Sequence, residues 1–320
     1  MRALNTHAVV IAGPTASGKS ALALNLAKAF GGTIINADSM QVYGGLEILT
    51  SQPDGEARAR FPHRVYGVLD AADPCSAARW RDLARAEIAH TEEAGRLPIL
   101  VGGTGLYLRT LARGIVPVPP IPAEARAEAR RRHAALGGER FRAELARLDP
   151  DAAARLHAGD TQRLIRAYEV ALGTGTSLSE WRHRGDGATN GNGDGLRLFT
   201  IVLDPPRAAL RAAIASRFEG MVKAGALDEV RALMARKLSP DLPAMKALGA
   251  RELARHIAGE ATVEDAIAAA AVATGQYAKR QATWFRHQMV ADTSITEKFS
   301  DSVLASVNSL VSKFMLTRKD

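Results

Sequence analysis

Brief apolar runs alternate with longer stretches of helical periodicity along most of this 320-residue chain. Some of the runs predict buried strands, because they are short, rich in apolar and β-branched residues, and bounded by glycine, proline or aspartate. They cover residues 8–12, 33–37, 97–101 and 196–203. Strands separated by helices are typical of an α/β fold, in which helices flank a parallel sheet.

Between and after these runs, apolar residues recur at intervals of three and four, which predicts helices. Residues 46–75 are instead punctuated by Gly, Pro and Asp and are predicted to be mostly loop. The predicted helices cover residues 76–94, 207–223, 225–236 and about 262–287, with one more ending at Ile257 and another in the terminal segment after residue 297.

A proline cluster at residues 117–122 marks a boundary in the chain. Beyond it, residues 123–173 are rich in Ala, Arg and Glu and predict three or four short helices, the last ending at Gly173. Residues 185–195 are rich in Gly and predict a flexible loop. The expected organisation is a core interrupted by a small all-helical domain. The core would cover residues 1–116 and 196–320, and the helical insertion residues 117–195.

The first strand leads into GPTASGKS, which fits the phosphate-loop pattern G-x-x-x-x-G-K-[ST]. Glycines let the backbone curl with its N–H groups inward, and the helix dipole and a lysine ammonium add positive potential. The pattern therefore predicts a di- or triphosphate site, with a serine hydroxyl placed to bind Mg²⁺. The residues of this loop are Gly13, Pro14, Thr15, Ala16, Ser17, Gly18, Lys19 and Ser20.

Two further features lie where the next strands end. Asp38 follows the second strand, where ligands of open α/β sheets usually bind, so it is a candidate for chemistry or metal binding; a turn or capping aspartate is the alternative. The third strand ends in GGTGLY, without the acidic residue that often holds Mg²⁺ in phosphate-loop kinases. This absence counts against ordinary nucleotide hydrolysis. The glycines predict a close backbone approach to a ligand, which the side chains of Thr104 and Tyr107 would then contact.

Composition narrows the possible classes of protein. Lys and Arg number 42 against 34 Asp and Glu, and the net charge of +8 suits a polyanionic partner. Cys75 is the chain's one cysteine, which excludes an internal disulfide or thiolate cluster, and the eight histidines show no zinc spacing. No apolar run approaches the about 18 residues that a membrane span needs, and the phosphate loop begins too early for a leader, so a cytoplasmic protein is expected.

Taken together, these motifs resemble one family, the tRNA dimethylallyltransferases, which modify the adenosine next to the anticodon. The resemblance spans nearly the whole chain in the family's order, and it combines the phosphate loop with segments that phosphate-loop proteins in general lack. The matching segments are GPTASGKS (13–20), ADSMQVYGGLEILTSQP (37–53), PHRVYGVLD (62–70), ILVGGTGLYL (99–108), DTQRLIRAYEV (160–170), SRFEGMVKAGALDEVRAL (216–233), LPAMKALGARELARHIAGE (242–260) and AKRQATWFR (278–286).

The resemblance implies a P-loop NTPase-like core that grips the pyrophosphate of dimethylallyl diphosphate instead of hydrolysing nucleotide. It implies Mg²⁺ as cofactor, bound by Ser20, with Lys19 and Arg217 beside the pyrophosphate and Asp38 as the base that deprotonates the adenine amine. The product would be N6-isopentenyladenosine and pyrophosphate. A compact, bacterial-type enzyme that acts as a monomer is expected.

The resemblance also implies which residues contact tRNA. They are Asp38, Ser39, Met40, Gln41, Thr104, Arg126, Gln162, Arg163, Leu164, Ile165, Arg166, Met245, Lys246, Ala247, Leu248, Gly249 and Ala250. Two departures from the family pattern are visible. Gly249-Ala250 stands where many relatives have Gly-Tyr, which would remove an aromatic contact, and the 185–195 segment is longer than usual.

Three other functions would each explain part of the sequence. A small-molecule kinase would explain the phosphate loop but not the segments around Asp38 and Thr104. A non-catalytic RNA-binding protein would explain the charge and leave the loop without a role. An adenylate isopentenyltransferase uses the same donor with free AMP, but it scarcely needs an arginine-rich helical insertion.

Overall fold

The structure, a computed structural model, describes residues 6–186, 195–297 and 301–317. The chain divides into two compact units, and each is described by itself. The first unit joins Met1–Ala112 to Asp194–Asp320, and the second is Arg113–Gly193. The second unit thus begins before the proline cluster at which the sequence places a boundary.

The first unit is built on a six-stranded sheet in the order β3-β2-β4-β1-β5-β6, in which every pair of described neighbours is parallel. The four strands that the sequence predicts are confirmed within two residues at each end. Two edge strands of two and three residues were not predicted. The strands are β1 (Thr6–Ala12), β2 (Gly32–Asn36), β3 (His63–Arg64), β4 (Leu97–Gly102), β5 (Leu196–Leu203) and β6 (Thr293–Ile295).

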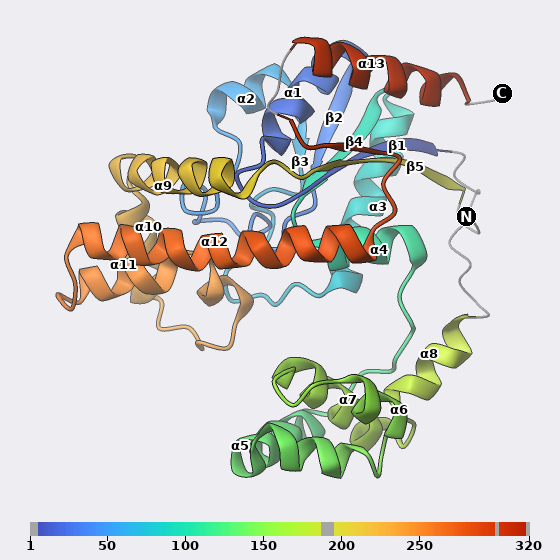
Figure 1. Cartoon of the computed structure of the whole chain (residues 1–320), viewed down its shortest axis with the longest axis vertical. Helices are drawn as coiled ribbons and strands as arrows, with labels where there is room; N and C mark the ends of the chain where they lie inside the picture. Colours follow the sequence, from blue (N-terminus) through green and yellow to red (C-terminus); the bar gives the residue numbers. More distant parts are fainter. Residues whose placement is uncertain (1–5, 187–194, 298–300, 318–320) are drawn as a thin grey trace. The chain divides into compact units, whose positions relative to one another are not determined.

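Helices cover both faces of this sheet, which explains why its central strands are apolar throughout. Alternate residues of β1 enter different cores: Val9 and Ile11 pack with helices α1 (Lys19–Phe30) and α13 (Asp301–Leu316), whereas Ala8 and Val10 belong to the larger core on the other face (Figure 1). That larger core contains residues of six other helices: α3 (Ala77–Glu93), α4 (Gly105–Arg113), α9 (Arg207–Lys223), α10 (Ala226–Ala235), α11 (Ala250–Ile257) and α12 (Val263–Gln288). The α/β prediction with a parallel sheet is therefore confirmed.

The predicted helices of this unit are present, and two further helices were not predicted: α2, in the segment predicted to be loop, and α4, directly after the glycines that follow β4. The helices are α1 (Lys19–Phe30), α2 (Gly55–Arg60), α3 (Ala77–Glu93), α4 (Gly105–Arg113), α9 (Arg207–Lys223), α10 (Ala226–Ala235), α11 (Ala250–Ile257), α12 (Val263–Gln288) and α13 (Asp301–Leu316), with a short 3₁₀ helix at Pro243–Lys246.

The glycines after β4 are required for close packing within the protein. A Cβ on Gly102 would lie 2.0 Å from the carbonyl oxygen of Ala37, just after β2. One on Gly103 would meet the amide of Gln281 at 2.2 Å, and one on Gly105 the ring of Trp284 at 2.1 Å. These glycines therefore have a packing role that was not predicted, because α12 and the end of β2 occupy the space in which side chains would stand. Their approach to a ligand stays a prediction.

The second unit is all-helical. Its helices are α5 (Ala123–Leu145), α6 (Pro150–Arg155), α7 (Thr161–Thr174) and α8 (Leu178–Asp186). Phe141, Leu145 and Leu164 are fully buried in its core. The buried carboxylate of Asp149 accepts hydrogen bonds from the backbone N–H groups of Ala152, in α6, and Ser179, in α8, which ties these helices together.

Two predictions for this unit need correction. Helix α7 ends at Gly175, which adopts the left-handed conformation with φ 69°, and not at Gly173. Helix α8, which was not predicted, extends to Asp186 and so takes the first two residues of the expected 185–195 loop. Residues 187–194 of that loop lie outside the described residues.

The Gly102 contact gives a stability prediction. Gly102→Ala should lower the free energy of unfolding by about 1–3 kcal/mol, because the added methyl group meets backbone that cannot move independently. Gly220→Ala, in α9 with open space around the site, should instead raise it by about 0.5–1 kcal/mol. Urea unfolding followed by circular dichroism measures both. Equal stability of the Gly102→Ala variant and the parent chain would contradict the packing described here.

Candidate active site

The phosphate loop joins β1 to α1 and has an unusual backbone. Gly13, Ala16 and Gly18 have φ values of 148°, 63° and 93°, and a Cβ on Gly13 would lie 2.5 Å from the carbonyl oxygen of Leu203. These angles curl the chain into the N-terminus of α1, whose first N–H groups have no partner within the helix. The loop therefore has the backbone form of an anion site.

Thr15, in the middle of this loop, is held by two helices from the far end of the sequence. Its backbone N–H donates to Oε1 of Gln281 on α12 at 2.9 Å. Its hydroxyl accepts a hydrogen bond from Arg217 on α9 at 3.2 Å. The loop is thus fixed in shape by the protein itself.

Two cations lie at the loop, and neither forms an ion pair with a carboxylate of the described residues. The Lys19 ammonium donates to the Pro14 carbonyl oxygen at 2.6 Å. Burial lowers the pKa of Lys19 to about 8, nearby Asp38 opposes this shift, and Arg217 adds to it. Burial also lowers the pKa of Arg217. Desolvated cations without a counter-ion create a strong preference for an anionic ligand.

The two serines of the loop differ in their surroundings. The Ser17 hydroxyl is buried and has no hydrogen-bond partner within the described part of the chain. Ser20, the second residue of α1, is exposed. No group of three or more carboxylate, His or Cys side chains that could hold a metal occurs among the described residues. A cation here would therefore depend on Ser20, ligand oxygens and water.

Asp38 lies just beyond β2 and is half-buried. Its Oδ1 accepts from the Met40 N–H at 2.9 Å, and the Asn36 side chain fixes its backbone by bonding both the N–H and the carbonyl oxygen of Asp38. The second carboxylate oxygen forms no hydrogen bond with any described residue. Asp38 is thus a turn aspartate, as the alternative proposed, that still has an oxygen available for chemistry.

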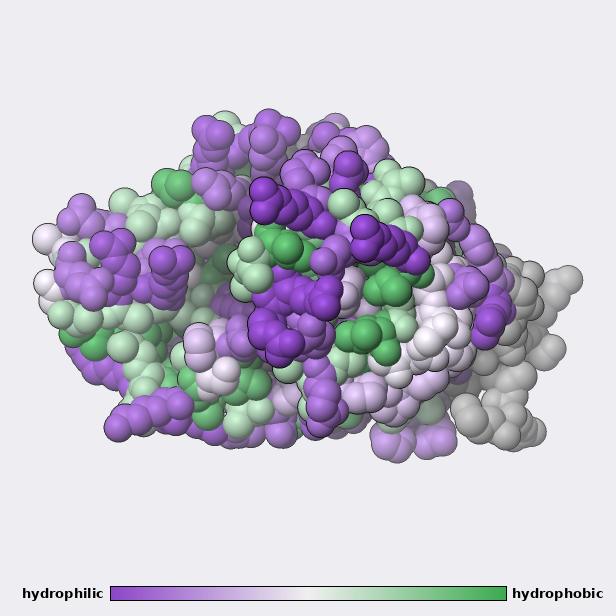
Figure 2. All heavy atoms as spheres, turned by 90° about the horizontal axis from the view of Figure 1, so that it is seen from below, coloured by the Kyte–Doolittle hydropathy of each residue, from purple (hydrophilic) through white to green (hydrophobic). Residues whose placement is uncertain are grey.

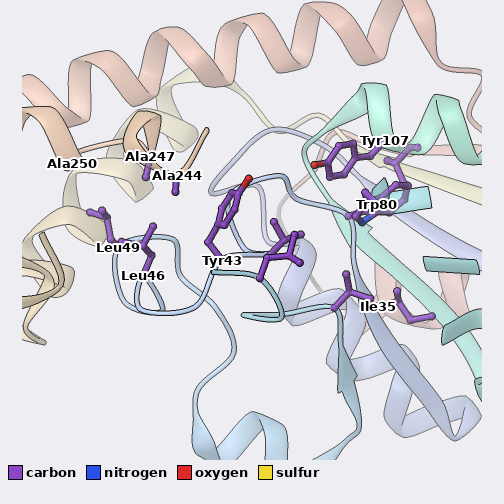
Figure 3. Packing of buried hydrophobic residues seen from close by; sticks show 14 of the residues in the cluster. Ile35, Tyr43, Leu46, Leu49, Trp80, Tyr107, Ala244, Ala247 and Ala250 are labelled. Atoms are coloured by element: carbon purple, nitrogen blue, oxygen red, sulfur yellow. The ribbon is translucent and has the colours of Figure 1, made fainter. Parts of the chain in front are cut away.

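Three tyrosines from different parts of the chain lie within electrostatic reach of this carboxylate. Burial raises the pKa of the phenols of Tyr66, Tyr107 and Tyr277, and the negative charge of Asp38 contributes to each shift. Tyr107 is buried and stacks on Trp80 with ring centroids 4.6 Å apart (Figure 3). The ring is therefore part of the core and is not offered to a ligand, which corrects the prediction for Tyr107. Neither Tyr66 nor Tyr277 was predicted as a site residue.

Thr104 joins the segment after β4 to the one after β2. Its hydroxyl accepts from the Ser39 N–H at 2.9 Å and donates to the Ser39 hydroxyl at 3.2 Å. Gln41 is directed to the backbone instead, donating to the carbonyl oxygens of Thr50 and Ser51. The structure therefore brings Asp38, Ser39 and Thr104 together with the phosphate loop, and Gln41 shapes the neighbouring turn.

Residues 245–250 are mostly packed against the protein. Ala247 and Ala250 are buried in the same cluster as Leu46 and Leu49 (Figure 3). Gly249 has φ 86°, and a Cβ there would lie 2.6 Å from the Phe218 ring. The remaining residues are more accessible: Lys246 is exposed, and Met245 and Leu248 are half-buried.

In the helical unit, the predicted arginines lie on the surface. Arg126, Gln162, Arg163 and Arg166 are exposed and Ile165 is half-buried, whereas Leu164 belongs to the core. Arg166 pairs with Glu169 at 2.6 Å, and Arg163 lies 4.0 Å from Asp160. Hydrophilic side chains are likewise prominent on the face drawn in Figure 2, interspersed with hydrophobic groups.

The surroundings of Cys75 disfavour a chemical role for its thiol. Burial raises the pKa of the Cys75 thiol, which disfavours the reactive thiolate. Among the described residues, none of the helices combines the length and apolar character needed to cross a bilayer.

Gln281 is a site residue that sequence reasoning missed. It lies on the buried face of α12 together with Thr274, Ala278 and Phe285. A long polar side chain on such a buried face is the signal that could have identified it.

The pKa of Lys19 gives a pH prediction. Below about pH 8 the ammonium is charged and attracts an anion; above it the free protein has lost that proton, which must be taken up again on binding. Affinity for pyrophosphate should therefore fall as the pH rises from about 7 to about 9. Titration calorimetry of the parent chain and of Lys19→Met measures this. A pH dependence of equal size in both proteins would contradict the assignment to Lys19.

Comparison with known proteins agrees with this geometry. A family model described as IPP transferase matches residues 41–288, and one described as isopentenyl transferase matches residues 6–73. The chain is 52% identical to a tRNA dimethylallyltransferase of Paramagnetospirillum magneticum, over 99% of each chain. It is 55% identical to the protein of that name from Rhodospirillum centenum, over 88% of this chain and 89% of the relative.

Solved structures give the same result. A tRNA isopentenylpyrophosphate transferase of Bacillus halodurans has a TM-score of 0.68 and 30% identity, with 98% of each chain covered. A eukaryotic dimethylallyltransferase described as acting on tRNA has a TM-score of 0.81 and 25% identity, and the match covers 98% of this chain and 80% of that one. With relatives at 52% and 55% identity matched over nearly their full length, and a family model matching residues 41–288, the chain belongs to the tRNA dimethylallyltransferase family.

Proposed function

We propose that the chain transfers the dimethylallyl group of dimethylallyl diphosphate to the exocyclic amine of the adenosine 3′-adjacent to the anticodon of tRNA. The observation that carries the proposal is the pairing of an anion site with a carboxylate. Lys19 and Arg217 lie at the phosphate loop and form no ion pair with a carboxylate of the described residues. Asp38 is within electrostatic reach of Lys19, and one of its carboxylate oxygens has no hydrogen bond in the described part of the chain. The names of the relatives supply the donor class and the acceptor.

On the donor side, the loop from Gly13 to Ser20 would bind the diphosphate. Lys19 and Arg217 would neutralise the charge that develops on the leaving pyrophosphate as its bond to the dimethylallyl carbon breaks. The buried Ser17 hydroxyl, which has no hydrogen-bond partner among the residues that the structure describes, supports a hydrogen bond to the same group. Their catalytic effect would be greatest in the transition state, where that charge grows.

Mg²⁺ fits this site through Ser20. The hydroxyl is exposed at the start of α1, and magnesium is commonly held by few protein ligands together with substrate phosphates and water. Bound there, the ion would add charge stabilisation to the leaving pyrophosphate.

On the acceptor side, Asp38 would take a proton from the adenine amine as the carbon–nitrogen bond forms. An exocyclic amine is a weak nucleophile, so a base positioned at this atom lowers the barrier. The Met40 N–H and the Asn36 side chain hold the carboxylate in place, so its free Oδ2 is the atom we assign to the proton transfer.

The tRNA contacts divide by exposure. The exposed Arg126, Gln162, Arg163 and Arg166, with Lys246, are suited to phosphates and bases of the anticodon stem-loop. Thr104 and residues 38–41 would meet the target nucleotide, drawn out of its stack. The buried Leu164, Ala247, Gly249 and Ala250 would act through backbone and packing. A monomeric, cytoplasmic enzyme remains our expectation.

Two alternative functions would use the same phosphate loop. A small-molecule kinase is disfavoured because β4 ends in Gly102 and is followed by Gly103, so the acidic residue that often holds Mg²⁺ at this point in phosphate-loop kinases is missing there. An adenylate isopentenyltransferase is disfavoured because a free nucleotide has no use for the exposed arginines of α5 and α7. Both remain outcomes of the experiment that follows.

The substrate prediction is tested with labelled dimethylallyl diphosphate and Mg²⁺. Offered a stem-loop with three consecutive adenosines, AMP, or ATP with candidate acceptors, the chain should label the stem-loop alone, and a metal chelator should stop the reaction. Label on AMP but not RNA would identify an adenylate isopentenyltransferase, whereas ATP consumption with phosphorylated acceptor would identify a kinase. Either result would refute the proposal.

The role of Asp38 is tested with Asp38→Asn and Asp38→Ala. Asparagine can still accept from the Met40 N–H but cannot take a proton, so turnover should fall by about 10²-fold or more while tRNA affinity is largely retained. Asp54→Asn is the matched control, because Asp54 caps α2 and asparagine caps equally well. Single-turnover rates and filter binding measure the two quantities. Normal turnover of Asp38→Asn would rule out Asp38 as the base.

A further inference from the structure

Gln281 is a buried amide that connects two loops far apart in the sequence. Only 6% of its surface is exposed. Its Oε1 accepts from the Thr15 N–H of the phosphate loop at 2.9 Å, and its Nε2 donates to the Gly103 carbonyl oxygen at 2.8 Å. An amide is the side-chain group that can supply both a donor and an acceptor at these two sites without a charge.

The packing around Gln281 leaves little room for adjustment. Its Nε2 stands where a Cβ on Gly103 would be, and one turn later Trp284 occupies the corresponding space at Gly105. The loop after β4 is therefore pressed directly against α12. A shift of either loop would break one of the two hydrogen bonds of Gln281.

Each of these bonds leads to one side of the reaction. Thr15 belongs to the loop that carries Lys19, and its hydroxyl contacts Arg217. Gly103 precedes Thr104, whose hydroxyl holds Ser39, the neighbour of Asp38. One side chain thus spans the distance between the anion-binding loop and the segment that carries the carboxylate.

We propose that Gln281 is a positioning residue that fixes the spacing between the diphosphate loop and the Asp38–Thr104 segment. This inference rests on the proposed prenyl transfer, in which the carbon of the bound donor must approach the amine next to Asp38. Gln281 touches neither reactant. It acts through Thr15 and Gly103, and its loss would misplace the two halves of the site relative to each other.

The first test compares Gln281→Met, which keeps length and loses both hydrogen bonds, with Gln276→Met, the same change at an exposed position of α12. Gln281→Met should lower kcat by about 10²-fold, the cost of a misplacement of about 1 Å, with smaller changes in KM. Gln276→Met should behave as the parent. If Gln281→Met lowers the melting temperature but leaves kcat of the folded protein unchanged, the residue is merely structural and the inference fails.

The second test uses the pH dependence of Gln281→Glu. The ionised carboxyl accepts from Thr15 but repels the Gly103 carbonyl oxygen, whereas its protonated form again offers a donor and an acceptor. Burial raises the pKa of such a carboxyl. The ratio of variant to parental kcat should therefore rise as the pH falls from about 8.5 to about 6. The new charge also shifts the titration of neighbouring groups such as Lys19 and Asp38, so Gln281→Met, which adds no titrating group, is the reference, and its ratio to the parent should stay flat. A ratio for Gln281→Glu as flat as that for Gln281→Met would overturn the inference.

Prenyl transfer by the parent chain distinguishes a failure of the proposed function from a failure of the positioning role of Gln281. No transfer by the parent would refute the proposed function. Transfer by the parent together with parental kcat in both Gln281 variants would refute the positioning role alone. Pyrophosphate binding, measured by calorimetry in the same proteins, needs no turnover and should change far less than kcat in Gln281→Met, and not at all in Gln276→Met. A loss of binding as large as the loss of kcat would show that Gln281 supports the phosphate loop alone and would overturn the spacing role.

Discussion

The hydrogen bonds to Thr15 are the interactions on which the site depends. A phosphate loop is short and carries residues with unfavourable backbone angles, here including Ala16 with φ 63°. Such a conformation persists only where its surroundings determine it. Gln281 and Arg217 provide that support from α12 and α9. A preorganised loop loses less conformational entropy on binding than one that must be ordered by the ligand.

This arrangement requires that α12 come close to the ends of the central strands, and the glycines after β4 allow it. Gly102 lets the loop touch the segment after β2, while Gly103 and Gly105 admit Gln281 and Trp284. The contacts combine residues from the beginning, the first third and the last part of the chain. A site assembled in this way cannot form before the sheet and α12 have packed. Its geometry therefore depends on the tertiary structure of the whole unit.

Much of the fold could be predicted from the sequence because its strands are apolar on both faces. The runs at 8–12 and 97–101 are explained by burial between two layers of helices. The edge strands β3 and β6 are too short to leave a pattern, and α8 lies where turn residues suggested none. Gly102, Gly103 and Gly105 were recognised as points of close approach, but a sequence does not say whether the neighbour is a ligand or the protein itself.

The motif residues of the site were predicted from the sequence, whereas the residues that support them were not. Lys19, Asp38 and Thr104 stand in local patterns with a known physical use. Gln281, Tyr66 and Tyr277 do not, because their importance comes from contacts across more than a hundred residues of sequence or from proximity to a carboxylate elsewhere in the chain. Their role depends on tertiary structure, which local periodicity does not encode.

The most direct measurement of the central claim is a crystal structure of the chain with a non-reactive thio analogue of dimethylallyl diphosphate, Mg²⁺ and an anticodon stem-loop. The proposed prenyl transfer predicts that the diphosphate oxygens bind Lys19, Arg217 and the N–H groups of the phosphate loop. It also predicts the exocyclic nitrogen of an extruded adenine within hydrogen-bond distance of Asp38, facing the dimethylallyl carbon. A diphosphate bound away from Lys19, or an adenine whose amine is out of reach of Asp38, would contradict it.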